Sequence, residues 1–163
     1  MAKKEKKERP DISKQQIKEV MGFCAIYKEI QMRTKYYPLR RPSFMARLRV
    51  DTSHWQIDGC IDYDREHVRK LHKDDQRFIK QYEYDMRILY FLKFGFESIS
   101  DSRTREIGEK TLLGGVKCKE LSKQLNCCLA SVYWERDNAK RIVAKFIEES
   151  RRKYGHEQDC SIF

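Results

Sequence analysis

The stretch VKCKELSKQLNCCLASVYWERDNAKRIVAKFIEESRRKY, residues 116–154, decides the fold that we predict for this chain. Leu121 and Leu125 lie four residues apart and would face inward on a first, short helix. Asn126 stands where a tight turn needs a residue that tolerates positive φ. Val132 then returns to the core from a second helix. This succession is the steric pattern of a helix-turn-helix.

The second helix of this stretch is predicted to be long. It starts near Cys128 or Leu129, and the sequence carries no stop signal before Gly155. Its expected inner stripe consists of Val132, Ala139, Ile142, Val143, Phe146 and Ile147.

A recognition helix in the major groove places its N-terminal residues on base edges and its flanks on phosphates. On that basis we expect the base contacts to come from Leu129, Ala130, Ser131 and either Trp134 or Glu135. The expected phosphate contacts are Lys123, Arg136, Lys140 and Arg141. The predicted interface also includes Lys119, Tyr133 and Asp137.

The segment KELSKQLNCCLASVYWERDNAKRIV resembles the helix-turn-helix of sigma factor region 4, and resembles still more the small phage regulators of the ArpU/RinA kind. Those regulators carry the phrase S-x-x-T-V-Y-x-x-R-x-x-A, which here corresponds to Cys128, Ser131, Val132, Tyr133, Arg136 and Ala139. The resemblance covers about the last quarter of the chain. It implies promoter binding, activation of late genes and, in some members, contact with RNA polymerase. Cys128 departs from the pattern, because it replaces the usual Ser or Thr cap.

The N-terminal part is basic. Residues 1–50 hold 14 Lys and Arg against 5 Asp and Glu, within a chain whose net charge is +10. Such a block suits a polyanion, whose binding releases condensed counterions, and it equally suits a solubilising tail.

After a charged start, a helix is predicted from about Asp11 to Tyr36, capped by Asp11 or Ser13. Pro38 and Pro42 are expected to break it. The arm that follows mixes arginines with aromatic residues, which suits either nucleic-acid contact or a packed linker. Arg40 and Arg41 are its candidate phosphate contacts.

A central helix is predicted from about Lys73 to Phe96, with Asp74 and Asp75 at its start and Gly95 as its C-cap. It is apolar on more than one face, so it either lies at the centre of the fold or makes a dimer contact. A shorter helix from Asp101 to Leu113 should end at the double glycine that precedes residue 116.

Catalytic and metal chemistry find little support in the sequence. The six cysteines include no CxxC, and the loose trio of Cys60, His67 and His72 lacks a second ligand pair, so no metal or cofactor is expected. No P-loop, G-x-G-x-x-G or H-E-x-x-H motif occurs, and the chain is not expected to be an enzyme. The sequence shows no signal peptide and no transmembrane run. We therefore expect a cytoplasmic location and no membrane contact. The terminal CSIF formally fits a prenylation box, whose meaning stays open.

The sequence therefore predicts an all-α, DNA-binding transcriptional regulator of phage or bacterial origin, in which the helix at residues 74–96 is a candidate homodimer surface. Two alternatives remain: a phage terminase small subunit, and a protein-interaction or inhibitor module that uses the basic N-terminus. The expected parts are a tail at 1–10, a basic helix and arm at 11–65, a central helical region at 66–115, the helix-turn-helix at 116–155 and a tail at 156–163.

Overall fold

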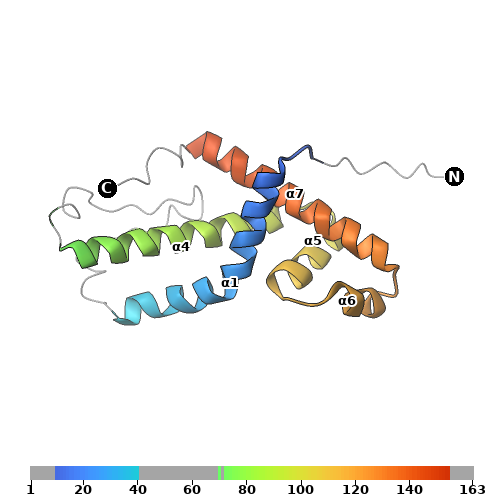
Figure 1. The fold of residues 1–163 in the computed structure, drawn as a ribbon, viewed down its shortest axis with the longest axis horizontal. Coiled ribbons are helices and arrows are strands. Elements are labelled where there is room, and N and C mark those ends of the chain that lie inside the picture. Colours follow the sequence, from blue (N-terminus) through green and yellow to red (C-terminus); the bar gives the residue numbers. More distant parts are fainter. Residues whose placement is uncertain (1–9, 41–69, 71, 155–163) are drawn as a thin grey trace.

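The computed structural model describes residues 10–40, 70 and 72–154, and all regular structure in these ranges is helical (Figure 1). The predicted all-α class is confirmed for this part of the chain. The elements are α1 (Lys14–Arg40), α4 (Lys73–Glu97), α5 (Ser102–Gly108), the π-helix η2 (Glu109–Leu113), α6 (Cys118–Gln124) and α7 (Leu129–Tyr154).

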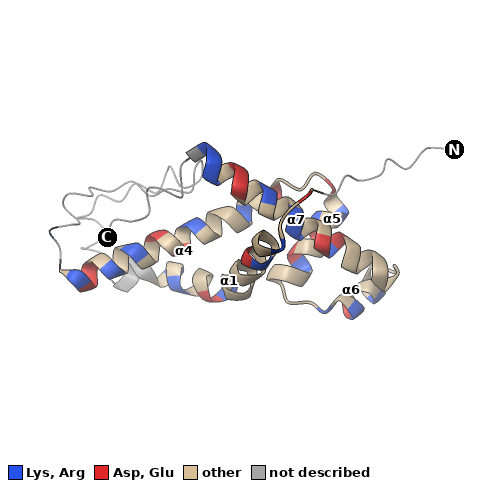
Figure 2. Ribbon diagram, turned by 45° about the horizontal axis from the view of Figure 1, so that its top comes forward, with Lys and Arg blue, Asp and Glu red and all other residues tan. Residues whose placement is uncertain are grey.

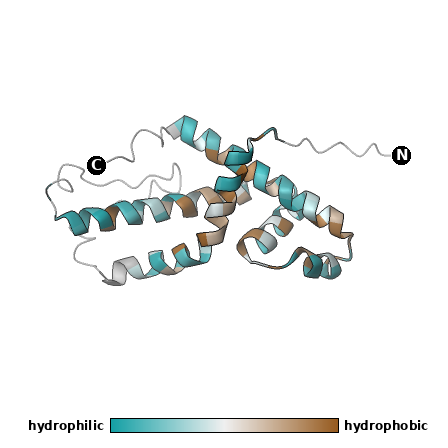
Figure 3. Ribbon diagram, viewed as in Figure 1, coloured by the Kyte–Doolittle hydropathy of each residue, from teal (hydrophilic) through white to brown (hydrophobic). Residues whose placement is uncertain are grey.

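The main core lies where α1, α4 and the C-terminal part of α7 meet. Figure 1 shows α1 crossing α7 and then turning to run beside α4. The hydrophobic residues of these helices gather around the crossing, as the hydropathy colours of Figure 3 indicate. Its fully buried members include Val20, Ile30, Ile88, Phe91, Leu92, Phe96, Ile99, Val143 and Ile147.

A second, smaller cluster lies under the N-terminal half of α7. Ile107 from α5, Cys118 and Leu121 from α6, and Val132 from α7 pack together there. Both α5 and α6 contact α7 (Figure 1). The short helices are therefore held to the fold by the same long helix that completes the main core.

The start of α1 agrees with the sequence, and its end does not. Ser13 Oγ accepts a hydrogen bond from the Gln16 backbone N–H (3.2 Å), and Gln16 Oε1 accepts one from the Ser13 N–H (2.9 Å). This reciprocal pair is a capping box, so Ser13 is the cap. The prediction that Pro38 breaks the helix is wrong, since α1 continues to Arg40. A proline within a helix removes one backbone hydrogen bond, and α1 tolerates that loss at Pro38.

The bounds of α4 match the prediction closely, with Asp74 and Asp75 in its first turn. Gly95, however, is not its C-cap, because the helix runs on to Glu97 and is capped at Ser98. A Cβ at Gly95 would lie 2.9 Å from Val143 Cγ1, so this glycine instead allows α7 to approach α4. The broad apolar surface of α4 is covered by α1 and α7 within one chain. Neither α4 nor any other described helix has the apolar length needed to cross a membrane.

The helices α5 and α7 approach each other still more closely than α4 and α7 do. A Cβ at Gly108 would lie 2.7 Å from the Ala139 Cβ and 3.0 Å from Phe96 Cε1. The Ala139 Cβ is fixed to the backbone of α7 and cannot rotate away. Only glycine at position 108 lets the two helices pack this closely.

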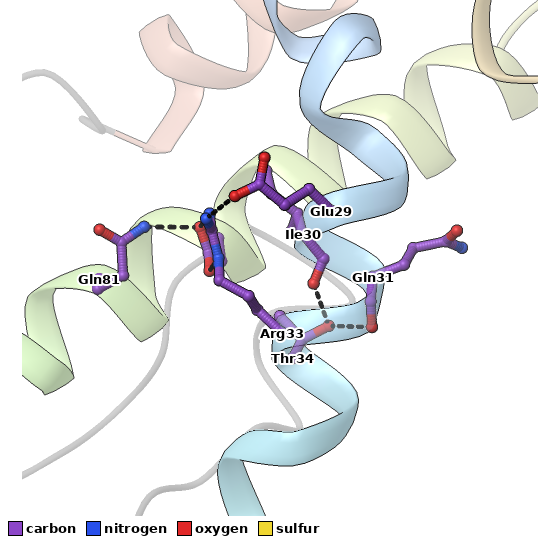
Figure 4. A network of polar contacts seen from close by, with 7 residues as sticks. Glu29, Ile30, Gln31, Arg33, Thr34 and Gln81 are labelled. Carbon is purple, nitrogen blue, oxygen red and sulfur yellow. Dashed lines mark hydrogen bonds and ion pairs between the residues drawn. The ribbon is translucent and has the colours of Figure 1, made fainter. Parts of the chain in front are cut away.

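One buried ionic contact joins α1 to α4 (Figure 4). Asp85 on α4 is fully buried, and Arg33 on α1 donates to it through Nε (3.0 Å) and Nη2 (2.8 Å). Gln81 Nε2 donates to the same carboxylate (2.8 Å), and Glu29 accepts from Arg33 Nη1 (2.6 Å). The carboxylate is thus neutralised and hydrogen-bonded, as burial of a charge requires.

Substitution of Gly108 by Ala is expected to lower the free energy of unfolding by about 1–3 kcal/mol, because the added methyl overpacks the α5–α7 contact. The matched control is Gly22→Ala in α1. A Cβ there has nothing within 4 Å, so alanine should raise stability by about 0.5–1 kcal/mol through helix propensity. Urea denaturation followed by circular dichroism measures both. Effects of the same sign in the two variants would contradict the close packing at Gly108.

Arg33→Ala is expected to destabilise the protein by about 3 kcal/mol, because it removes the two charged hydrogen bonds that the guanidinium donates to the buried Asp85 carboxylate. The control is Arg77→Ala, whose partner Asp74 lies 3.6 Å away on the surface, and whose loss should cost less than about 1 kcal/mol. The midpoints of urea denaturation at neutral pH compare the two. Equal losses would mean that Asp85 does not depend on Arg33.

Candidate nucleic-acid interface

The connection between α6 and α7 is short and depends on one unusual backbone conformation. Asn126 has φ of +48°, the one positive value among the described non-glycine residues. The Cys127 N–H donates to the Ser122 carbonyl across the turn (3.0 Å). The prediction that Asn126 takes up positive φ is confirmed, and asparagine tolerates it because its side chain is short and polar.

The inward contacts of this turn also follow the sequence pattern. Leu121 and Val132 are each fully buried, and they pack with Ile107 of α5, while Leu125 is half-buried against the same cluster. The inner stripe expected for α7 is buried or half-buried along its length. The opposite face of the first turns of α7 is therefore free to meet solvent.

Six of the predicted interface residues are exposed on the two contacting helices α6 and α7, and we call this set the α6–α7 surface. It consists of Lys119 and Lys123 on α6 and Leu129, Ala130, Tyr133 and Trp134 on α7. Lysines on α6 are visible as blue segments in Figure 2. The structure thus brings together cations and apolar side chains from two helices.

The predicted cationic flank of α7 lies differently. Asp137 receives Lys140 Nζ at 3.5 Å and Arg141 Nε at 3.0 Å, and all three side chains are half-buried. Arg141 Nη1 also donates to the Pro10 carbonyl (3.4 Å), so the segment before α1 lies against this flank. These charges bind other parts of the same chain.

Arg136 shares this inward position. Its Nε is buried without a hydrogen-bond partner in the structure. Arg136 and Lys140 both act electrostatically on the buried thiol of Cys24 in α1. Burial raises the pKa of Cys24 from 9.0 to about 12, and the two cations oppose that shift without overcoming it. The expectation that Arg136, Lys140 and Arg141 form an open phosphate-binding flank is therefore corrected: they pack toward α1 and the segment that precedes it.

Glu135 is also not a base-facing residue. It is buried, and Thr104 Oγ1 of α5 donates toward its carboxylate. The backbone N–H of the same threonine donates to Oδ2 of Asp101, the N-cap of α5 (2.7 Å). Glu135 therefore fixes α7 to the start of α5, which explains a carboxylate on the inner side of α7.

Two cations near the α6–α7 surface were not predicted. Arg103 of α5 lies with its Nη2 3.4 Å from the Oγ of the half-buried Ser131 in α7. Lys117 is exposed at the N-cap of α6. Lys117 could have been found from its position beside Lys119, whereas Arg103 could not, because 28 residues separate it from Ser131.

Other predicted sites cannot be placed. Arg40 ends α1 with its side chain outside the described residues, as are Arg41, Cys60, His67 and the terminal CSIF. Within the ranges that the structure describes, no three potential metal-ligating side chains of His, Cys, Asp or Glu gather in one place.

The Cys24 thiol should make stability depend on alkaline pH. The unfolded thiol ionises near its ordinary pKa of 9.0, while the folded one keeps its proton to about 12, so the free energy of unfolding should fall between these pH values. The slope from this group is at most about 1.4 kcal/mol per pH unit. Cys24→Ala should show a shallower slope. Burial also raises the pKa of Tyr27 and Tyr82, but both remain in the two proteins and cancel in the comparison. Identical slopes from pH 9 to 12 would contradict the shift.

Comparison with known proteins gives no family for this chain: no family model matches it, and neither a curated protein nor a solved structure shows significant similarity to it.

Proposed function

We propose that this protein binds double-stranded DNA as a transcriptional regulator, with α6 and α7 acting as a helix-turn-helix of the sigma region 4 kind. The observation that carries the proposal is the turn between the two helices. Asn126 has positive φ, and the residues on either side of it, Leu121 and Val132, are buried against α5. This arrangement leaves the first turns of α7 exposed, as a recognition helix requires.

Charge supports a polyanionic partner. Lys117, Lys119 and Lys123 are exposed along α6, and none of them forms an ion pair with another described residue. Exposed lysines suit phosphate oxygens, whose neutralisation releases counterions. The phosphate contacts in this proposal therefore come from α6 and from Arg103, in place of the packed flank of α7.

Regulation of transcription is the extension that the sigma-like pattern from Cys128 to Ala139 suggests. In this proposal the protein occupies promoter DNA, and a neighbouring RNA polymerase is the partner that its position on the promoter would influence. The protein would act by binding, without a chemical step of its own. A protein-binding role for the same surface is the competing reading, favoured by the exposure of Tyr133 and Trp134.

The test is the salt dependence of binding to duplex DNA, measured by fluorescence anisotropy. The double variant Lys119→Ala/Lys123→Ala should reduce the slope of log affinity against log salt by about 1.8, or about 0.9 for each lost phosphate contact. Non-specific affinity should fall with it at every salt concentration.

Two further double variants remove the same charge elsewhere. Lys73→Ala/Lys80→Ala, on the exposed side of α4, should leave the slope unchanged. Arg136→Ala/Lys140→Ala tests the packed flank and should alter stability more than the slope. If the α4 variant changes the slope as much as the α6 variant does, the α6–α7 surface is not the DNA-binding site.

A further inference from the structure

The exposed part of α7 is unusually apolar. Six large hydrophobic side chains are exposed in the described ranges, and three of them lie within six residues of α7. These are Leu129, Tyr133 and Trp134, with exposed fractions of 38%, 52% and 36%. Ala130 is exposed beside them. We call these four residues the reading face.

The four residues share one side of the helix. Seen down the helix axis, positions i, i+4, i+1 and i+5 span an arc of about 140°, because successive residues turn by about 100°. Five residue steps rise roughly 7.5 Å along the axis. Base pairs stack about 3.4 Å apart, so the reading face could span two or three consecutive steps.

Polar groups that read bases are missing from this face. Guanine is read by Arg or Lys, adenine by Asn or Gln, and cytosine by Glu or Asp. The carboxylates nearest to the face are already engaged: Glu135 is buried against Thr104, and Asp137 is bonded to Arg141 and Lys140. Thymine alone among the four bases offers the major groove a methyl group, which apolar side chains contact.

Charge complementarity selects DNA over an apolar protein partner. The exposed lysines at positions 117, 119 and 123 line α6, next to the turn from which α7 starts. Arg103 lies beside Ser131 of α7. A row of cations beside an apolar patch matches phosphates beside thymine methyls.

We propose that the reading face recognises the 5-methyl groups of thymines in the major groove, so that the protein selects sites rich in A·T pairs at the centre of each contact. This inference rests on the proposed DNA-binding function and adds the chemical feature that is read. Tyr133 has the largest exposed fraction of the three large side chains, and the small side chain of Ala130 permits close approach of the helix.

The test compares thymine with uracil, which lacks only the methyl group. A binding site is first selected from randomised duplexes with the wild-type protein. The same duplex is then synthesised with uracil in place of thymine, and both are titrated by fluorescence anisotropy. Affinity should fall about fourfold for each contacted methyl, from the free energy of burying one methylene-sized group. The salt slope should not change, because the phosphates are the same.

Variants assign the methyl effect to α7 rather than to a change in DNA stiffness. Leu129→Ala and Tyr133→Ala should bind the thymine and uracil duplexes with nearly equal affinity. Tyr84→Ala is the matched control, since Tyr84 on α4 is 49% exposed and lies outside the α6–α7 surface. It should keep the full preference for thymine. Both tyrosines are surface residues, and circular dichroism verifies that each variant is folded.

The outcomes separate the inference from the function on which it rests. If wild-type protein binds both duplexes equally, with the salt slope intact, methyl recognition is excluded while DNA binding stands. If the preference for thymine survives in both Leu129→Ala and Tyr133→Ala, the reading face does not read the methyl groups. If no duplex is bound at any salt concentration, the proposed function fails, and the apolar surface belongs to a protein contact.

Discussion

The position of the α6–α7 surface depends on the close approach of α5 to α7 at Gly108. Because this residue has no Cβ, the two helices meet almost backbone to backbone beside Ala139. That contact places Ile107 where Leu121 and Val132 can pack on it, and so closes the small cluster under α7. A larger side chain would separate α5 from α7 and disrupt the cluster on which α6 packs. A second glycine, Gly95, likewise allows α4 to approach α7 beside Val143. The two glycines therefore hold α7 close to both α4 and α5.

The surroundings of the long helix α7 therefore differ along its length. Its C-terminal part completes the main core with α1 and α4. There, Arg151 makes a bidentate ion pair with Glu19 of α1 (2.6 and 2.9 Å). Around its middle, Arg136, Lys140 and Arg141 turn toward α1 and the segment before it. The first turns of α7 carry its exposed large hydrophobic side chains among the described residues. A duplex partner would thus meet the end of the helix, with the remainder acting as a rigid support.

Neighbouring residues at the start of α7 differ in burial and therefore in the contacts that they can make. Glu135 is withdrawn from solvent by its contact with Thr104, and this leaves its neighbours Tyr133 and Trp134 as the exposed side chains. The lysines of α6 provide the charge that this part of α7 lacks. Affinity for a polyanion and discrimination among bases would then come from separate helices, one cationic and one apolar.

The sequence by itself determined the local structure: the helical periodicity of α4 and α7, a cap of α1 at Asp11 or Ser13, and the turn at Asn126. These depend on interactions among residues a few positions apart, which a linear pattern records. It failed at Pro38 and Gly95, because whether a helix continues through such a residue depends on what packs against it. The tertiary structure alone decided which charges stay exposed. Arg136 and Lys123 look alike in the sequence, yet Arg136 is half-buried within electrostatic reach of Cys24 in α1, whereas Lys123 faces solvent. Only the arrangement of helices distant in the sequence fixes which charged side chains are covered.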